Sequence, residues 1–137
     1  MFFWVGVSEG RLIWIPRKPT PLGFMLKTCV DTLSGVCLSA EIVEGAEVDA
    51  TKEHVEKWGK TTACTLRLVQ RWQGTGRIVL GDAWFGSFRT ATCLLTNGLF
   101  FVGNVKTGHK RFPKVLLKSK LKGRGSHAHM KVPVPFV

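Results

Sequence analysis

Acidic residues are absent from the whole C-terminal part of this 137-residue chain. All nine Asp and Glu residues lie in residues 1–82, where ten Lys and Arg leave a net charge of +1. Residues 83–137 hold ten Lys and Arg and no acid, a net charge of +10. Such an uneven charge distribution favours binding to a polyanion, with nucleic acid as the first candidate and an acidic membrane surface as the second. Alternatively, the chain is a fragment that has lost an acidic neighbouring region, whose negative charge once balanced the positive charge of residues 83–137.

The chain also lacks the cysteine spacing of a zinc site. Its four cysteines are Cys29, Cys37, Cys64 and Cys93, and no two of them form a CxxC pair. Each lies in an apolar stretch, where a free thiol behaves as a small hydrophobic side chain. We therefore predict four reduced core residues and no zinc module.

No targeting or membrane segment is evident. The start, MFFWVGV, is apolar but short, and it lacks both a basic flank and a small-residue cleavage site. No stretch approaches the roughly 20 apolar residues of a membrane span. The prediction is an intracellular protein, nuclear or cytoplasmic, without a membrane partner.

Hydrophobic residues make up 45% of the chain, which is enough for one globular core. In the first part we expect a strand over 11–17, a loop over 17–23 and a β-hairpin with arms 24–31 and 36–45. In the second arm, Val36, Leu38, Ala40 and Ile42 alternate with Cys37, Ser39, Glu41 and Val43. This alternation predicts that one face of the hairpin is buried.

The remaining elements alternate between helix and strand. We expect an exposed connection over 47–60, helices over 60–72, 87–96 and 113–120, a buried strand over 77–82 and a strand over 99–107. Thr61 or Thr62 is placed to cap the first helix, and Asn97-Gly98 to close the second. The order predicts an α/β fold with a mixed sheet, in a domain over 1–125 followed by an irregular tail over 126–137.

One carboxylate, Asp82 in RIVLGDAWFGSF, directly follows the apolar run of a predicted strand. Ligands of open α/β sheets bind at the carboxyl ends of the strands, and Gly81 and Gly86 allow the backbone to turn sharply there. Asp82 is thus a candidate ligand for Mg²⁺. The alternative is structural, because Asp82 or Ser87 could simply cap the next helix.

Several ordered motifs resemble the central part of a piggyBac-type transposase domain. They are IPRKP at Ile15–Pro19, DAWF at Asp82–Phe85, the strand FVGNVK, and the basic segment with Phe112-Pro113. The resemblance runs from Arg17 to Lys114. It implies a ribonuclease-H-like mixed sheet with flanking helices, truncated here at both ends. It also implies three aspartates that hold Mg²⁺ ions for cut-and-paste DNA transposition, with Asp82 matching the second of them.

The other two aspartates of that pattern have no match here. Only fourteen residues precede Ile15, and their one acid is Glu9, a candidate remnant; no acid follows Asp82. Because Mg²⁺ usually needs more than one anionic partner, Asp82 alone would be a weak, incomplete site. We therefore expect no transposase or nuclease activity from this polypeptide by itself and no cofactor bound to it.

The basic segment suggests a second function, a domesticated module that binds DNA without catalysis. Its candidate phosphate contacts are Lys106, Lys110, Arg111, Lys114 and Lys118. Such contacts give affinity without reading sequence. The alternatives to DNA binding are a solvated basic face without a partner and a decayed element without function. A dimer is a possible oligomeric state.

Overall fold

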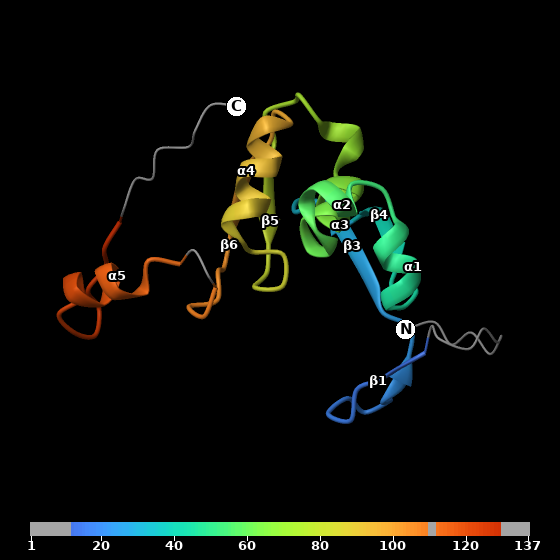
Figure 1. The fold of residues 1–137 in the computed structure, drawn as a ribbon, viewed down its shortest axis with the longest axis horizontal. Helices are drawn as coiled ribbons and strands as arrows, with labels where there is room; N and C mark the ends of the chain where they lie inside the picture. Colours follow the sequence, from blue (N-terminus) through green and yellow to red (C-terminus); the bar gives the residue numbers. More distant parts are fainter. Residues whose placement is uncertain (1–11, 110–111, 130–137) are drawn as a thin grey trace. The chain divides into compact units, whose positions relative to one another are not determined.

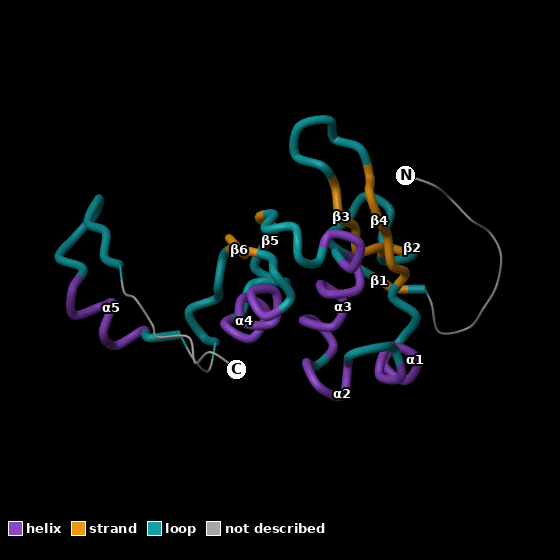
Figure 2. Tube along the Cα trace, turned by 90° about the horizontal axis from the view of Figure 1, so that it is seen from above, coloured by secondary structure: helices purple, strands orange, loops and turns teal. Residues whose placement is uncertain are grey.

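The computed structural model describes residues 12–109 and 112–129, which form a mixed α/β arrangement of short strands and helices (Figures 1 and 2). The chain divides into two compact units, residues 1–71 and 72–137. Within the described part, no helix has the length and apolar character needed to cross a bilayer. The predicted boundary between 1–125 and 126–137 stays a prediction.

The first unit begins with two antiparallel hairpins. Strand β1 (Ile13–Trp14) pairs with β2 (Leu22–Gly23), so the expected strand is shorter than predicted and the expected loop over 17–23 ends in a strand. Strands β3 (Leu26–Val30) and β4 (Cys37–Ile42) form the predicted hairpin. Its turn is fixed by Asp31, whose Oδ2 accepts hydrogen bonds from the Ser34 N–H at 2.8 Å and hydroxyl at 2.6 Å.

One face of β4 is more covered than the other, as the alternation predicts, but no residue of the strand is fully buried. Leu38 and Ile42 are exposed, whereas Ser39 and Glu41 are partly covered. The cause is the helix over Lys60–Leu68, because the Ser39 hydroxyl donates to the carbonyl oxygen of Leu68 at 2.7 Å and Glu41 accepts from Arg67. Hydrogen bonding to the helix, not hydrophobicity, decides which face is covered.

The expected connection over 47–60 is wrong, because it contains helices α1 (Ala46–Thr51) and α2 (Val55–Trp58). Helix α3 (Lys60–Leu68) and the 3₁₀ turn η1 (Gln70–Trp72) occupy the predicted helix over 60–72. Gly59, not Thr61 or Thr62, is at the N-cap position of α3. Ala63 and Leu66 of α3 and Val69 after it are buried, whereas Gln70 is exposed.

The second unit is a strand–helix–strand arrangement that continues into a short helix. Strands β5 (Ile78–Gly81) and β6 (Phe100–Gly103) are parallel, and α4 (Phe88–Thr96) packs beside them (Figure 1). The core is formed by Cys93, Leu94 and Leu99. Helix α5 (Lys114–Lys120) confirms the last predicted helix, and Gly98 ends α4 with a φ of 69°.

Two further predictions are only partly right. Strand β5 exists but is not buried, because Ile78 and Leu80 are exposed on one face. Cys64 and Cys93 are core residues as predicted, whereas Cys29 is half-buried and Cys37 is exposed. Burial, with the charge of Glu41 next in weight, raises the pKa of the Cys64 thiol to about 11, as expected of an inert core cysteine.

Candidate functional site

Asp82 lies where the two parallel strands of the second unit end together. The register pairs Gly81 of β5 with Gly103 of β6, so Asp82 and Asn104 leave the sheet from adjacent positions. This is the carboxyl edge, the usual location of a ligand in a parallel α/β arrangement. The position predicted for Asp82 from the sequence is therefore confirmed, and its side chain is exposed.

The turn after β5 is organised by Asp82 itself. Its Oδ1 accepts hydrogen bonds from the N–H of Trp84 at 2.8 Å and of Phe85 at 3.4 Å, and its main-chain oxygen accepts from the N–H of Gly86 at 3.0 Å. These bonds engage one carboxylate oxygen, Oδ1. Asp82 thus has a structural role in its own turn.

Ser87 caps the next helix, α4. Its hydroxyl oxygen accepts the N–H of Thr90 at 3.0 Å at the start of α4. Because Ser87 satisfies the helix, the carboxylate of Asp82 is not needed as a cap.

Glycines bring the backbone at this edge close together. A Cβ on Gly86 would lie 1.8 Å from the main-chain oxygen of Asn104, and a Cβ on Gly103 would lie 2.7 Å from the main-chain oxygen of Gly81. The ring of Phe101 lies against both Gly81 and Gly103, with ring atoms 2.9 Å and 2.6 Å from where their Cβ atoms would be. The turn of Asp82 is therefore held directly against the end of β6.

The predicted basic residues do not all lie in the described part. Lys106 is exposed in the loop after β6, the strand that pairs with β5, and β5 directly precedes Asp82. Lys114 and Lys118 are exposed on α5, four residues apart and so on one side of that helix. Lys110 and Arg111 lie outside the described residues, as does Glu9.

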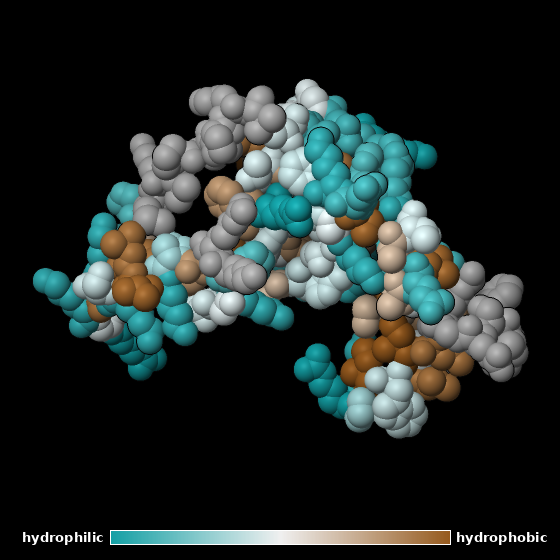
Figure 3. Space-filling model, viewed as in Figure 1, coloured by the Kyte–Doolittle hydropathy of each residue, from teal (hydrophilic) through white to brown (hydrophobic). Residues whose placement is uncertain are grey.

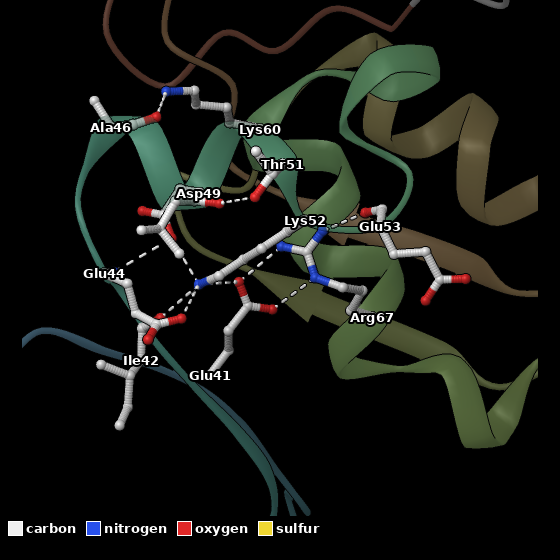
Figure 4. Close-up of polar contacts among 11 residues, drawn as sticks. Glu41, Ile42, Glu44, Ala46, Asp49, Thr51, Lys52, Glu53, Lys60 and Arg67 are labelled. Carbon is white, nitrogen blue, oxygen red and sulfur yellow. Dashed lines mark hydrogen bonds and ion pairs between the residues drawn. The ribbon is translucent and has the colours of Figure 1, made fainter.

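Sequence reasoning missed a cluster of charged residues in the first unit (Figure 4). Arg67 donates to both carboxylate oxygens of Glu41, from Nε at 2.9 Å and from Nη2 at 2.7 Å, and also to the main-chain oxygen of Glu53. Lys52 Nζ lies 2.6 Å from Asp49 Oδ1, 3.4 Å from Glu44 Oε2 and 3.5 Å from Glu41 Oε1. We refer to Glu41, Glu44, Asp49, Lys52 and Arg67 as the ion cluster.

The ion cluster is largely removed from solvent, and the carboxylates of Glu41 and Asp49 are held in the charged form. Burial alone would raise the pKa of Glu41, but the hydrogen bonds and charges of Arg67 and Lys52 outweigh it, so this pKa lies below its ordinary value. The pKa of Asp49 is lowered in the same way, against burial, chiefly by its hydrogen bond to Lys52. The residues come from β4, α1 and α3 and the segments between them, so the cluster fastens these elements together and has a structural role.

Comparison with known proteins agrees with the motifs. The family model described as "Transposase IS4" matches residues 10–134. A solved structure, the piggyBac transposase synaptic complex with hairpin DNA, is similar with a TM-score of 0.68 and 22% sequence identity. The similarity covers 86% of this chain and 23% of that one, so this chain spans less than a quarter of the length of that transposase. No curated protein matches.

The family model covers nearly the whole chain, and the structural similarity confirms the fold of this part of a piggyBac transposase. The resemblance predicted from the IPRKP and DAWF motifs is thereby confirmed. The chain belongs to the transposase IS4 family.

Proposed function

We propose that this chain is part of the ribonuclease-H-like catalytic core of a cut-and-paste DNA transposase. The observation that carries the proposal is the placement of Asp82, an exposed carboxylate at the carboxyl end of two parallel strands. The similar piggyBac structure is a synaptic complex with hairpin DNA, which supports DNA as the substrate class here. Members of the family use divalent metal ions in general, and Asp82 is the residue of this chain placed to contribute to such a site.

The residues present do not fit a complete metal site. Among residues 12–109 and 112–129 there is no cluster of three or more His, Cys, Asp or Glu that could hold an ion. Asp82 is exposed, and turn N–H groups occupy its Oδ1. A phosphoryl-transfer site of this kind needs several carboxylates, whereas residues 83–137 supply none. We therefore propose that Asp82 is one ligand of a shared site and that this polypeptide alone does not cleave DNA.

A paramagnetic ion tests the role of Asp82 directly. With millimolar Mn²⁺, we expect selective broadening of the backbone amide resonances around Asp82, and Asp82→Asn should abolish it. Asp31→Asn is the matched control, because Asp31 is also a turn aspartate but belongs to the other unit. Broadening that persists in Asp82→Asn would show that Asp82 is not a metal ligand.

A plasmid-nicking assay tests the absence of catalysis. Supercoiled DNA incubated with the chain and Mg²⁺ or Mn²⁺ should be nicked no faster than DNA in buffer. Metal-dependent nicking that disappears in Asp82→Asn would show that this chain does assemble a working site.

A second function, DNA binding without catalysis, is favoured by the net charge of +10 on residues 83–137. We propose that Lys106, Lys110, Arg111, Lys114 and Lys118 contact phosphates; three of these, Lys106, Lys114 and Lys118, are exposed in the described part. If about six phosphates are engaged, log K should fall with log salt with a slope of roughly −5.

The salt dependence also shows whether particular lysines contact phosphates or whether only the overall positive charge matters. Changing Lys114 and Lys118 together to Gln should make the slope shallower by about 2, because two phosphate contacts are lost. Lys18→Gln, an exposed lysine of the first unit, should leave the slope unchanged. A slope near zero for the unmodified chain would exclude this function.

A further inference from the structure

Trp84 presents an aromatic surface beside the candidate metal ligand. Its side chain is 42% exposed although it lies only two residues after Asp82. The main-chain N–H of Trp84 donates to Asp82 Oδ1 at 2.8 Å, so the backbone of Trp84 is held by the same carboxylate. A large apolar ring that is held at a ligand-binding edge and left accessible points to a binding role.

The indole ring is held in place by its neighbour. The rings of Trp84 and Phe85 meet edge to face, with centroids 4.7 Å apart and an interplanar angle of 84°. Phe85 is half-buried, and Gly86 behind it is packed against the main chain of Asn104. The ring therefore extends from an anchored turn, which lowers the entropy lost when a flat ligand stacks on it.

The charges around Trp84 select the part of a nucleic acid that could lie there. A nucleobase is neutral and has a π face, so the negative charge of Asp82 does not oppose a base lying on the ring of Trp84. Lys106 is exposed on the loop after the adjacent strand, and its positive charge suits the phosphate backbone of a nucleic acid that lies along this edge. Bases within a duplex are stacked on one another, so only an unpaired base can offer its face to a side chain.

We propose that Trp84 stacks on an unpaired nucleobase of DNA bound along the carboxyl edge of β5 and β6. This inference rests on the proposed DNA function and adds the ligand group and the residue that recognises it. It gives the site a preference for single-stranded or locally opened DNA, which phosphate contacts alone do not provide.

The test compares the affinity of the full chain for a single-stranded oligonucleotide of thymidines, about 20 nucleotides long, with that for a duplex of the same length. Trp84→Ala should weaken binding to the single strand by about ten- to a hundredfold and leave duplex binding nearly unchanged. Trp84→Phe, which keeps an aromatic face, should retain most of the affinity. Trp14→Ala is the matched control, because Trp14 is more exposed, at 63%, but lies in β1 of the other unit.

A spectroscopic measurement on the unmodified chain tests the same inference without depending on whether the Trp84→Ala variant folds. The indole N–H resonance of Trp84, assigned by its loss in Trp84→Phe, should shift on addition of the single strand and much less on addition of the duplex. Equal shifts with both DNAs, or equal single-strand affinity in the unmodified chain and Trp84→Ala, would overturn the stacking role while leaving DNA binding intact. Failure of the unmodified chain to bind either DNA would overturn the proposed function and this inference together.

Discussion

At Gly86 the backbone of the Asp82 turn lies so close to the end of β6 that no side chain fits. Gly86→Ala would place a carbon 1.8 Å from the main-chain oxygen of Asn104, an atom that cannot move without moving the strand. We expect this substitution to destabilise the second unit by about 3 kcal/mol, at the upper end of overpacking costs, and to displace Asp82.

Urea unfolding measures this effect, and Gly108→Ala is its control. Gly108 lies in the same unit, but no atom lies within 4 Å of where its Cβ would be. The control should change the free energy of unfolding by less than about 0.5 kcal/mol. If Gly86→Ala were equally mild, the close approach to Asn104 would not exist in solution.

The local role of Asp82 predicts different effects for two substitutions. Asp82→Asn keeps a side-chain oxygen that can accept the N–H of Trp84, whereas Asp82→Ala removes both side-chain hydrogen bonds of the turn. We expect Asp82→Ala to lower the free energy of unfolding by about 1 kcal/mol and Asp82→Asn by less than half of that. Thermal unfolding of the two variants would decide this. Equal losses would mean that the charge, and not the oxygen, stabilises the turn.

At the scale of elements, the ion cluster makes the first unit sensitive to acid. The pKa values of Glu41 and Asp49 are lowered in the folded chain from ordinary values of 4.5 and 3.8. The unfolded chain therefore takes up protons first as the pH falls. The stability from these groups is complete at neutral pH and is lost as the pH falls below about 5 and through their folded-state pKa values.

Glu41→Gln isolates the largest part of this effect. It should lower the free energy of unfolding at pH 7 by about 1–3 kcal/mol, because Arg67 loses its charged partner, and should flatten the decline between pH 5 and pH 3. Glu47→Gln, at an exposed position of α1, is the control and should leave the pH profile unchanged. An unaltered decline in Glu41→Gln would assign acid sensitivity to other carboxylates.

The elements that the sequence predicts well are those with local signals. Asp31 and its turn, Ser87 before α4 and Gly98 after it all act through neighbours within a few residues, and the hairpin and α4 follow from them. The position of Asp82 was predictable for the same reason, because it directly follows an apolar strand. Helix α1 was missed because it is only six residues long, has no side-chain cap and buries no residue, so it carries neither a capping signal nor an apolar face. The ion cluster was missed because some of its partners are distant in sequence, as with Arg67 and Glu41, which are 26 residues apart.

At the scale of the whole molecule, the strands are described as three separate two-stranded sheets. The hairpins β1–β2 and β3–β4 are antiparallel and β5–β6 is parallel, so no sheet among the described residues combines both pairings as the predicted mixed sheet would. How many strands share one sheet depends on long-range pairing, for which the sequence carries no local signal. Hydrophobic surface is visible over the β1 hairpin and over α5 in Figure 3. Leu22 of this hairpin and Val115 of α5 are exposed.

The open face of β5 and β6 leads to a prediction about solution behaviour. Four apolar side chains on this face are each more than half exposed, namely Ile78, Leu80, Phe100 and Val102. A contiguous apolar surface of this kind promotes association of a chain studied by itself. Leu80→Lys should therefore reduce light scattering and the binding of a hydrophobic dye, and should change the free energy of unfolding by less than about 0.5 kcal/mol.

Leu94→Ala is the contrasting variant, because Leu94 is fully buried in the core beside this sheet. It should destabilise the second unit by about 2–5 kcal/mol and increase dye binding. If Leu80→Lys proved as destabilising as Leu94→Ala, the face of β5 and β6 would be covered in solution. The covering segment would then have to come from this chain or a second copy, and the molar mass measured in the same solutions would distinguish the two.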